Sequence, residues 1–423
     1  MMRKDAAATH SFVMRSIWFS RYSGGMLSST NPISIFATTN ARRPFVSFGI
    51  RQSDRLQHMY VIGKTGTGKS SLLETLALQD IESGRGLAVV DPHGDLAERL
   101  VYQIPPERQA QLTYLNAPNL TQPYGYNPLR GVQSDRVPLA ASGLLEALQM
   151  LWPEAWGVRM EHVLRNALYA LIEAGDATLA DIGRMLSEPV FRAGVLKRVR
   201  NKQVRAFWQG EFPHYNPRYR QETIAPIQNK VGALLADPHL YRMLVEPPVD
   251  LHFRTLMDEG GILIVNLAKG RLGSDSAHLL GALLVTTLSL AALSRSGEPS
   301  SDRRPFFIYV DEFQSFTTLS VASMVSELRK FGVGLVLAHQ HLDQLSPEIR
   351  GAVLGNVGTL IAFRLGSHDA RAMGPEFEPV FDGHDLVTLA NHDIYLRLMI
   401  DGAPSRPFSA TTLAPSELAE PPK

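Results

Sequence analysis

The residues from Gly63 to Ser70 read GKTGTGKS and match the pattern G-x-x-x-x-G-K-S, which binds phosphate groups. A loop of this kind turns backbone N–H groups toward anionic oxygens, and its glycines allow dihedral angles and close approaches that a Cβ atom would block. We expect Lys69 to reach the β and γ phosphates and the hydroxyl of Ser70 to be a ligand of Mg²⁺. The predicted nucleotide-binding residues are Gly63, Lys64, Thr65, Gly66, Thr67, Gly68, Lys69, Ser70 and Ser71.

A second group that could do chemistry is the acidic pair Asp311 and Glu312, which follows four apolar residues, 307–310. Transfer of a phosphoryl group to water needs one carboxylate near Mg²⁺ and another that orients or deprotonates the attacking water. Asp311 is predicted to take the first role and Glu312 the second. An Asp-Glu pair is common by itself, but after an apolar strand in a chain that has a phosphate loop it is a strong signal. Gln340, at the exit of another apolar run, could sense the γ phosphate or hold water.

Other polar residues at predicted strand ends carry weaker signals. Asp91 and His93 follow an apolar run, and the carboxyl ends of strands face the ligand crevice in open α/β sheets. Asp95 precedes a glutamate by three residues, as in a capping box, and is predicted to be a helix N-cap. His339 and His341 stand two residues apart without further ligands, so we expect solvated or supporting groups rather than a metal pair.

Strands and helices must hold these residues in place, and the hydrophobic pattern predicts where they lie. Short continuous apolar runs are typical of the buried strands of a parallel sheet. They occur at 59–62, 87–90, 112–115, 261–267, 307–310, 332–340, 358–366 and 394–400. A helical pattern, SLLETLALQD, follows the phosphate loop and would direct the positive end of its dipole at the phosphates. This alternation predicts an α/β fold with a central, mostly parallel sheet.

The bulk composition is that of an ordinary globular protein without disulfide bonds. The chain has 423 residues, 44% of them hydrophobic, which predicts two or three structural units. It has no cysteine, which agrees with a cytosolic setting. The formal net charge is +1, so a nucleic-acid surface must be a local patch. The longest apolar run, 279–293, is shorter than the roughly 20 residues of a membrane span. It predicts a buried helix, and no transmembrane anchor is expected.

Both ends of the chain are predicted to lie outside the folded core. Residues 1–43 are rich in Ser, Thr and Asn, which is typical of a loosely ordered extension or of translation from an upstream start codon. No apolar core followed by a small-residue cleavage site marks them as a signal peptide. The composition after about Pro407 predicts a C-terminal tail, which we bound at 413–423.

Between residues 132 and 250 the alternation stops, and helical patterns follow one another, as at 142–152, 159–174 and 224–237. This predicts an all-α domain inserted into the α/β domain. Its segment 191–219 interleaves basic and aromatic residues, as surfaces that bind single strands or phosphate backbones do. A solvated helix face with its aromatic residues in the core has the same composition. The residues are Arg192, Lys197, Arg198, Arg200, Lys202, Arg205, Trp208, Phe212, Tyr215 and Tyr219.

Five motifs together resemble those of the ATPase domains of type IV secretion coupling proteins, the TraG/TraD conjugative DNA-transfer family, and of the related HerA/FtsK group of DNA translocases. They are GKTGTGKS, VVDPHGDLAE, YVDEFQSF, LRKFGVGLVLAHQ and GNVGTLIAFRLGS. They occur in the order found in the family, within a similarity that covers about 45–412. The resemblance implies a RecA-like P-loop ATPase core at 44–131 and 251–412, with the all-α domain inserted at 132–250.

The resemblance also implies what the residues do. Lys69 and Ser70 match the Walker A lysine and hydroxyl, Asp311 and Glu312 match the Walker B pair, and Gln340 matches the glutamine of the third motif. The implied cofactors are ATP and Mg²⁺, with Ser70 and Asp311 as the metal ligands. The implied assembly is a homo-hexameric ring around DNA, with nucleotide between neighbouring subunits.

Arg329 matches the position of the family's arginine finger. A cation supplied by a neighbouring subunit would stabilise charge that develops on the γ phosphate. A surface arginine near a helix end is the alternative, since cations suit that end of the dipole. Lys330, Arg364 and Arg397 are competing candidates for the finger.

Three functions from different classes fit these observations. The leading one is an ATP-hydrolysing DNA translocase or coupling ATPase of conjugative type IV secretion, with secretion or relaxase-type proteins as partners. It would lie in the cytoplasm, or at the inner membrane through partners, since the transmembrane pair of membrane-bound coupling proteins is not seen. The alternative is a secretion or assembly ATPase that acts on protein partners without binding DNA. A nucleotide-gated scaffold without hydrolysis is the third, and the presence of both Asp311 and Glu312 argues against it.

Overall fold

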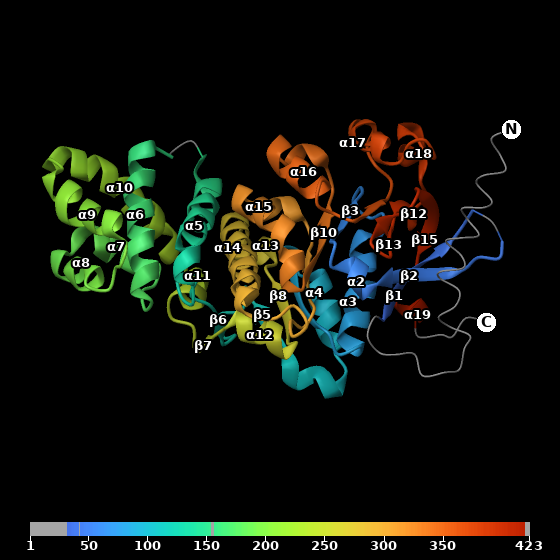
Figure 1. Ribbon diagram of the computed structural model, residues 1–423, viewed down its shortest axis with the longest axis horizontal. Helices are drawn as coiled ribbons and strands as arrows, with labels where there is room; N and C mark the ends of the chain where they lie inside the picture. The colour runs from blue at the N-terminus through green and yellow to red at the C-terminus, as the bar shows by residue number, and fades with distance from the viewer. Residues whose placement is uncertain (1–31, 42, 154–155, 419–423) are drawn as a thin grey trace. The chain divides into compact units, whose positions relative to one another are not determined.

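The computed structural model describes residues 32–41, 43–153 and 156–418 (Figure 1). The chain forms two compact units, Met1–Gln79 with Val357–Lys423, and Asp80–Asn356. We call the first the P-loop unit, because it contains Gly63 to Ser70, and the second the acidic-pair unit, because it contains Asp311 and Glu312.

The sheet of the P-loop unit has the strand order β2, β1, β15, β12, β11, β3. Strands β11 and β3 run parallel, and the other neighbours in this order run antiparallel. The strands are β1 (Ile33–Thr39), β2 (Ser47–Arg51), β3 (Met59–Ile62), β11 (Thr359–Ala362), β12 (Asp393–Arg397) and β15 (Phe408–Thr412), and a separate hairpin pairs β13 (Met399–Ile400) with β14 (Ala403–Pro404). The helices are α2 (Gln52–Arg55), α3 (Lys69–Glu82), α17 (Ser367–Met373), α18 (Gly383–Thr388) and α19 (Pro415–Leu418).

Two segments that composition places outside the core are strands of this sheet. The loosely ordered extension predicted for 1–43 lies partly outside the described residues, but 33–39 form β1. There Phe36 is buried, and the hydroxyl of buried Ser34 accepts hydrogen bonds from Gln52 Nε2 (2.9 Å) and Arg55 Nη1 (3.1 Å). Residues 408–412, within the tail-like composition after Pro407, form β15. Both strands are short, with few large apolar residues, so their pairing is not visible in local sequence.

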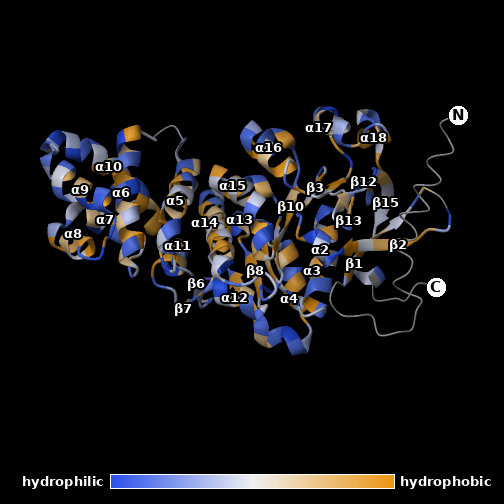
Figure 2. Ribbon diagram, in the orientation of Figure 1, coloured by the Kyte–Doolittle hydropathy of each residue, from blue (hydrophilic) through white to orange (hydrophobic). Residues whose placement is uncertain are grey.

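The sheet of the acidic-pair unit has the order β10, β9, β4, β8, β5, and every neighbouring pair is parallel. Its strands are β4 (Gly86–Asp91), β5 (Leu112–Asn116), β8 (Ile262–Asn266), β9 (Phe306–Val310) and β10 (Val333–His339). All residues of β4, β8, β9 and β10 are buried, as the continuous apolar runs predict. Figure 2 shows hydrophobic residues along β8 and β10.

The helices that connect or follow these strands are α4 (Asp95–Tyr102), α12 (Phe253–Glu259), α13 (Lys269–Leu272), α14 (Ser274–Leu293), α15 (Leu319–Leu328) and α16 (Pro347–Leu354). One helix of the described residues, Ser274–Gly297, is long and apolar enough to cross a membrane, but 78% of its apolar window is buried inside the protein. The prediction that the run 279–293 is a buried helix is confirmed. This helix can be long and apolar because the rest of the protein covers most of its surface.

The described residues between 134 and 244 form helices and turns, with 154–155 outside the description. The helices are α5 (Val137–Leu151), α6 (Val158–Ala174), α7 (Asp181–Ser187), α8 (Pro189–Leu196), α9 (Lys202–Ala206), the π-helical segment η4 (Phe207–Glu211), α10 (Pro217–Leu235) and α11 (Pro238–Leu244). Helices thus fill the stretch for which the sequence predicts an all-helical insertion, and α5 packs against α14 and α15 (Figure 1). Helix α10 begins earlier than its apolar pattern, because Asn216 caps it and polar residues fill its first turns.

Candidate functional site

In the P-loop unit, the glycines of the phosphate loop are needed for different reasons. Gly66 has φ +75° and Gly68 has φ +120°, a region that side chains disfavour. Gly63 is needed for space, because a Cβ there would lie 2.6 Å from Phe363 Cβ. A Cβ at Gly68 would also lie 2.8 Å from Nδ1 of His392. The loop therefore has the open backbone that a phosphate cradle requires.

Lys69 is the first residue of α3 and lies across this loop. It is only 6% exposed, and its Nζ donates hydrogen bonds to Gly63 O (2.6 Å) and Lys64 O (3.0 Å). The hydroxyl of Thr67 donates to Lys64 O at 2.7 Å, and the amide of Lys64 donates to Arg364 O at 2.9 Å. These bonds tie the loop to itself and to the residues after β11, so that the lysine ammonium is held at the helix N-terminus.

In the acidic-pair unit, Asp311 and Glu312 follow β9, and each is 6% exposed. The backbone of Asp311 stays in the sheet, because its amide donates to Val90 O at 3.1 Å. Glu312 departs from it with φ +48°, an unfavourable conformation for a residue with a Cβ. Its amide donates to Asp311 Oδ1 at 3.0 Å. Backbone strain of this kind often occurs at functional sites.

The carboxylate of Glu312 is held by two glutamine amides. Gln314 Nε2 donates to Glu312 Oε2 at 2.6 Å, and Gln340 Nε2 donates to Glu312 Oε1. His93 Nε2 lies 3.9 Å from Oε1. Sequence reasoning placed Gln340 and His93 at strand ends of this kind, but it missed Gln314. The only local signal for Gln314 was its position two residues after the glutamate.

Glu312 lines an open hollow of about 500 Å³ at the carboxyl ends of β4, β8, β9 and β10. The hollow's lining is mostly polar, namely His93, Met150, Lys269, Ser274, His278, Glu312, Gln314, Ser315, Gln340 and Gln344. Burial, and to a lesser degree the ammonium of Lys269, lower the pKa of His278. Sequence reasoning named neither Lys269 nor His278, because they come from the helices α13 and α14, which carry no recognisable motif. The hollow gives water access to Glu312.

The prediction for the segment after β4 is partly wrong. Helix α4 begins at Asp95, with Gly94 at the N-cap, so Asp95 is not the capping residue. Instead Asp91 closes the turn, since its carboxylate accepts hydrogen bonds from the amides of His93 (2.8 Å) and Ala97 (3.0 Å). Gly94 has φ +96°, and this left-handed turn lets the earlier aspartate reach the helix amides. The carboxylate of Asp91 therefore stabilises this turn, whereas His93 lines the hollow.

The candidates for the arginine finger lie in different settings. Arg329 follows α15, is exposed, and forms no ion pair within the described residues, and Lys330 beside it is also exposed. Arg364, in the P-loop unit, donates to Leu389 O at 3.3 Å and Asn391 Oδ1 at 2.9 Å. Arg397 pairs with Glu376 at 2.9 Å. Within the part of the chain that the structure describes, Arg329 and Lys330 are thus the two cations of this set that are exposed and without an ion pair.

The basic and aromatic residues of 191–219 separate in space. Trp208 and Phe212 are buried and pack on one another with ring centroids 4.7 Å apart, while Tyr215 and Tyr219 extend this cluster. The guanidinium of Arg192 lies 5.2 Å from the ring centre of Phe212. Trp208 and Phe212 therefore do not form an exposed aromatic platform on which bases could stack. The exposed cations are Lys197, Arg198, Arg200 and Lys202, of which Arg198 pairs with Asp176 at 2.7 Å.

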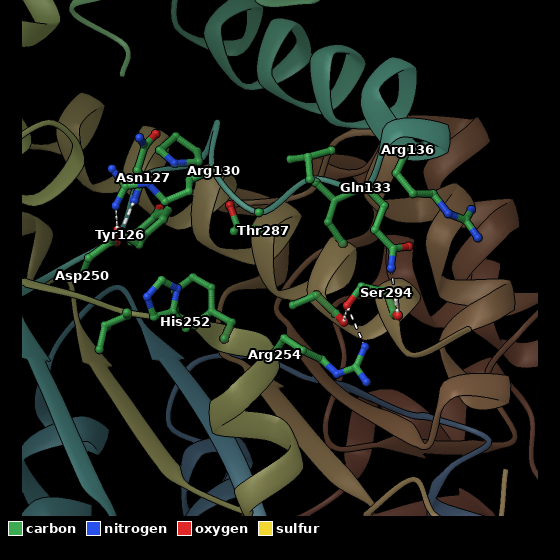
Figure 3. A pocket seen from close by; sticks show the side chains of 17 residues that line it. Tyr126, Asn127, Arg130, Gln133, Arg136, Asp250, His252, Arg254, Thr287 and Ser294 are labelled. Carbon is green, nitrogen blue, oxygen red and sulfur yellow. Dashed lines mark hydrogen bonds and ion pairs between the residues drawn. The ribbon is translucent and has the colours of Figure 1, made fainter. Parts of the chain in front are cut away.

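A second cavity, of about 110 Å³, lies where the insertion joins the sheet (Figure 3). There β6 (Tyr124–Gly125) and β7 (Val249–Asp250) pair in parallel as the two connecting segments. Cations line it, but Arg130 pairs with Asp250, and Arg254 pairs with Asp258 and Glu298. Because these charges are compensated, the cavity does not resemble a phosphate site.

Comparison with known proteins supports the resemblance seen in the motifs. Residues 254–372 match the model of a family described as the type IV secretion-system coupling protein DNA-binding domain. No curated protein matches the chain.

Solved structures match over most of the chain. The unbound monoclinic form of the bacterial conjugative coupling protein TrwBdeltaN70 has 16% identity and a TM-score of 0.60, covering 86% of this chain and 87% of that one. The plasmid coupling protein TrwB in complex with ADP and Mg²⁺ has 16% identity and a TM-score of 0.60, with 87% of each chain covered. VirB4 of Thermoanaerobacter pseudethanolicus has 16% identity and a TM-score of 0.62, covering 91% of this chain and 98% of that one.

The predicted α/β P-loop ATPase fold is confirmed by these structures, and the predicted resemblance to type IV secretion coupling ATPases is confirmed by the family model together with them. At 16% identity the solved structures show the fold alone.

Proposed function

We propose that this protein is an ATPase that moves DNA, of the coupling-protein type used in type IV secretion. The observation that carries the proposal is that one chain contains two devices. One is a complete phosphate loop with Lys69 held across it, and the other is a buried glutamate held by two amides at the carboxyl end of a parallel sheet. The first is a device for binding a triphosphate, and the second a device for activating water.

The residues fit Mg²⁺ and ATP as the cofactor and substrate. Gly66 and Gly68 have the conformations that open the loop's amides, and Ser70 follows Lys69 at the start of α3. Ser70 and Asp311 would hold Mg²⁺, which would neutralise charge on the phosphate oxygens. TrwB structures in complex with ADP and Mg²⁺ and with a non-hydrolysable ATP analogue support this assignment.

In this proposal each residue of the chain has a defined task. The loop amides and Lys69 bind and orient the triphosphate, which lowers the barrier by positioning and by charge. Glu312 orients the attacking water and accepts its proton, while the amides of Gln314 and Gln340 hold the carboxylate. Arg329 would stabilise the γ phosphate of a nucleotide bound to a neighbouring subunit. That role requires an oligomer, for which we propose a homo-hexameric ring.

Replacing Arg329 with Ala is expected to lower kcat for ATP roughly 100-fold, the loss typical of removing one donor that stabilises the transition state. Affinity for ATP should change little, because the finger acts mainly on charge that develops on the γ phosphate in the transition state. The measurement is steady-state ATPase with a fluorescent nucleotide titration alongside. Lys330→Ala is the competing variant, and a loss in it with none in Arg329→Ala would transfer the role to Lys330.

DNA contact is proposed for the exposed cations of the insertion, Arg200 and Lys202, which form no ion pair within the part of the chain that the structure describes. Backbone contact by cations needs no aromatic platform. A double variant, Arg200→Glu with Lys202→Glu, should weaken DNA binding and lower the slope of log K against log salt by about one per cation that contacts a phosphate.

The control for this experiment is Arg371→Glu with Arg406→Glu, which changes the net charge equally at exposed positions of the P-loop unit. Binding is measured by fluorescence anisotropy at several salt concentrations. Equal weakening in both pairs would assign the effect to net charge alone. ATPase rates with and without DNA complete the test, and a rate indifferent to DNA at low salt would count against translocation.

A second candidate is a secretion or assembly ATPase that acts on protein partners. The burial of Trp208 and Phe212 favours it, because it removes the stacking surface that single-strand binding commonly uses. In this case the double variant would keep any protein-stimulated activity. Secretion or relaxase-type partners, a role in conjugation, and a location in the cytoplasm or at the inner membrane through partners belong to the leading proposal.

A further inference from the structure

We propose that Gln314 is a positioning residue of the hydrolytic site, which holds the carboxylate of Glu312 in the orientation that water activation requires. The inference deepens the proposed ATPase function and rests on it. Gln314 lies in the turn η7 (Phe313–Ser315), directly after the acidic pair, and lines the same hollow as Glu312.

The contact between the two side chains is short and has a defined direction. Gln314 Nε2 donates to Glu312 Oε2 at 2.6 Å. The reverse orientation of the amide would place two acceptor oxygens against each other, so the NH₂ group must face the carboxylate. A hydrogen bond to a charged acceptor is among the stronger ones in proteins. With Gln340 on Oε1, each oxygen of the carboxylate has one amide donor and retains capacity to accept from water.

The backbone explains why the carboxylate needs such support. Glu312 has φ +48° and leaves the strand, so the sheet does not fix its side chain. The turn that follows is stable by itself, since Ser315 N donates to Glu312 O at 2.8 Å and Thr317 Oγ1 donates to Phe313 O at 2.6 Å. The turn therefore carries Gln314 to a fixed place beside Glu312.

The oxygen atom of the Gln314 amide indicates that this residue serves function rather than stability. Gln314 Oε1 is buried and has no hydrogen-bond partner among the described residues. Leaving a buried acceptor unpaired costs folding free energy, and an apolar side chain of similar size would avoid that cost. A glutamine is favoured here only if its NH₂ group does something that an apolar residue cannot. Within the described part of the chain, the partner of that group is Glu312.

The test is Gln314→Met, which keeps an unbranched side chain of similar length and removes both polar ends of the amide. We expect kcat for ATP to fall about tenfold, because the carboxylate loses one of its two orienting donors. KM and the Kd of a fluorescent ATP analogue should stay unchanged, and Tm should stay equal or rise. Gln344→Met is the matched control, since Gln344 lines the same hollow, is exposed, and has no side-chain bond to Glu312 in the described structure.

The outcomes separate this inference from the proposed function. If the unaltered protein hydrolyses ATP and Gln314→Met has the kcat of Gln344→Met, Gln314 does not position Glu312. A fall in Tm together with kcat and nucleotide affinity would assign Gln314 a structural role and also overturn the inference. If the unaltered protein has no ATPase activity with or without DNA, the proposed function itself fails. A selective fall in kcat supports the inference.

Discussion

Replacing Glu312 with Gln is expected to lower kcat for ATP hydrolysis by about 1000-fold, within the range of roughly 10²–10⁴ that general acid–base catalysis contributes. The substitution keeps the size of the side chain and removes the basic oxygen that accepts a proton from water. Nucleotide binding should survive, because the phosphate loop lies in a different part of the chain. Single-turnover hydrolysis and an equilibrium titration with a fluorescent ATP analogue measure the two quantities separately.

The control is Glu327→Gln, which removes an exposed carboxylate from α15 in the same unit. It should retain full activity, and this excludes an effect of net charge. Hydrolysis that continues undiminished in Glu312→Gln would remove Glu312 from its role and leave His93, 3.9 Å away, as a remaining basic group at the hollow. If the unaltered protein binds ATP but hydrolyses it under no condition, the result would instead favour a nucleotide-gated scaffold.

The elements that bear the motifs could be predicted because their signals are local. Four fully buried strands read as continuous apolar runs, and the residues after them, such as Glu312 and Gln340, are polar because the chain leaves the sheet there. The phosphate loop was recognisable because its glycines have conformations that other residues disfavour. Periodicity likewise identified α5, α6 and most of α10, since each buries one face.

The remainder depends on contacts between distant residues, which local patterns do not encode. Strand β1 pairs with β15, at the other end of the chain, and neither strand has a strong apolar signal. The basic and aromatic segment could be interpreted in two ways from composition, and only packing shows that Trp208 and Phe212 face the core. Gln314 was overlooked for a related reason, because its importance depends on the conformation of Glu312 and not on its own type.

The second large effect is expected for Lys69→Ala, which should weaken ATP binding at least about 100-fold. A hydrogen bond to a charged group contributes about 1.5–3 kcal/mol, and the ammonium can donate to more than one phosphate oxygen. Lys69 is 6% exposed and already bonded to the carbonyls of Gly63 and Lys64, so its position needs little reorganisation when a phosphate arrives. Hydrolysis should fall with binding, unlike in Glu312→Gln.

Two further variants make this prediction specific to the shape of the loop. Lys69→Arg keeps the charge, but its wider, planar guanidinium does not reproduce a compact ammonium that bonds both Gly63 O and Lys64 O, so it should lose nearly as much affinity as Lys69→Ala. Arg371→Ala, which removes an exposed cation from the same unit, should bind ATP normally. Full binding by Lys69→Arg would mean that the loop provides only a positive field. Since the two carbonyl bonds of Lys69 place a compact ammonium at the loop, loss in both Lys69 variants is the result that a true phosphate cradle requires.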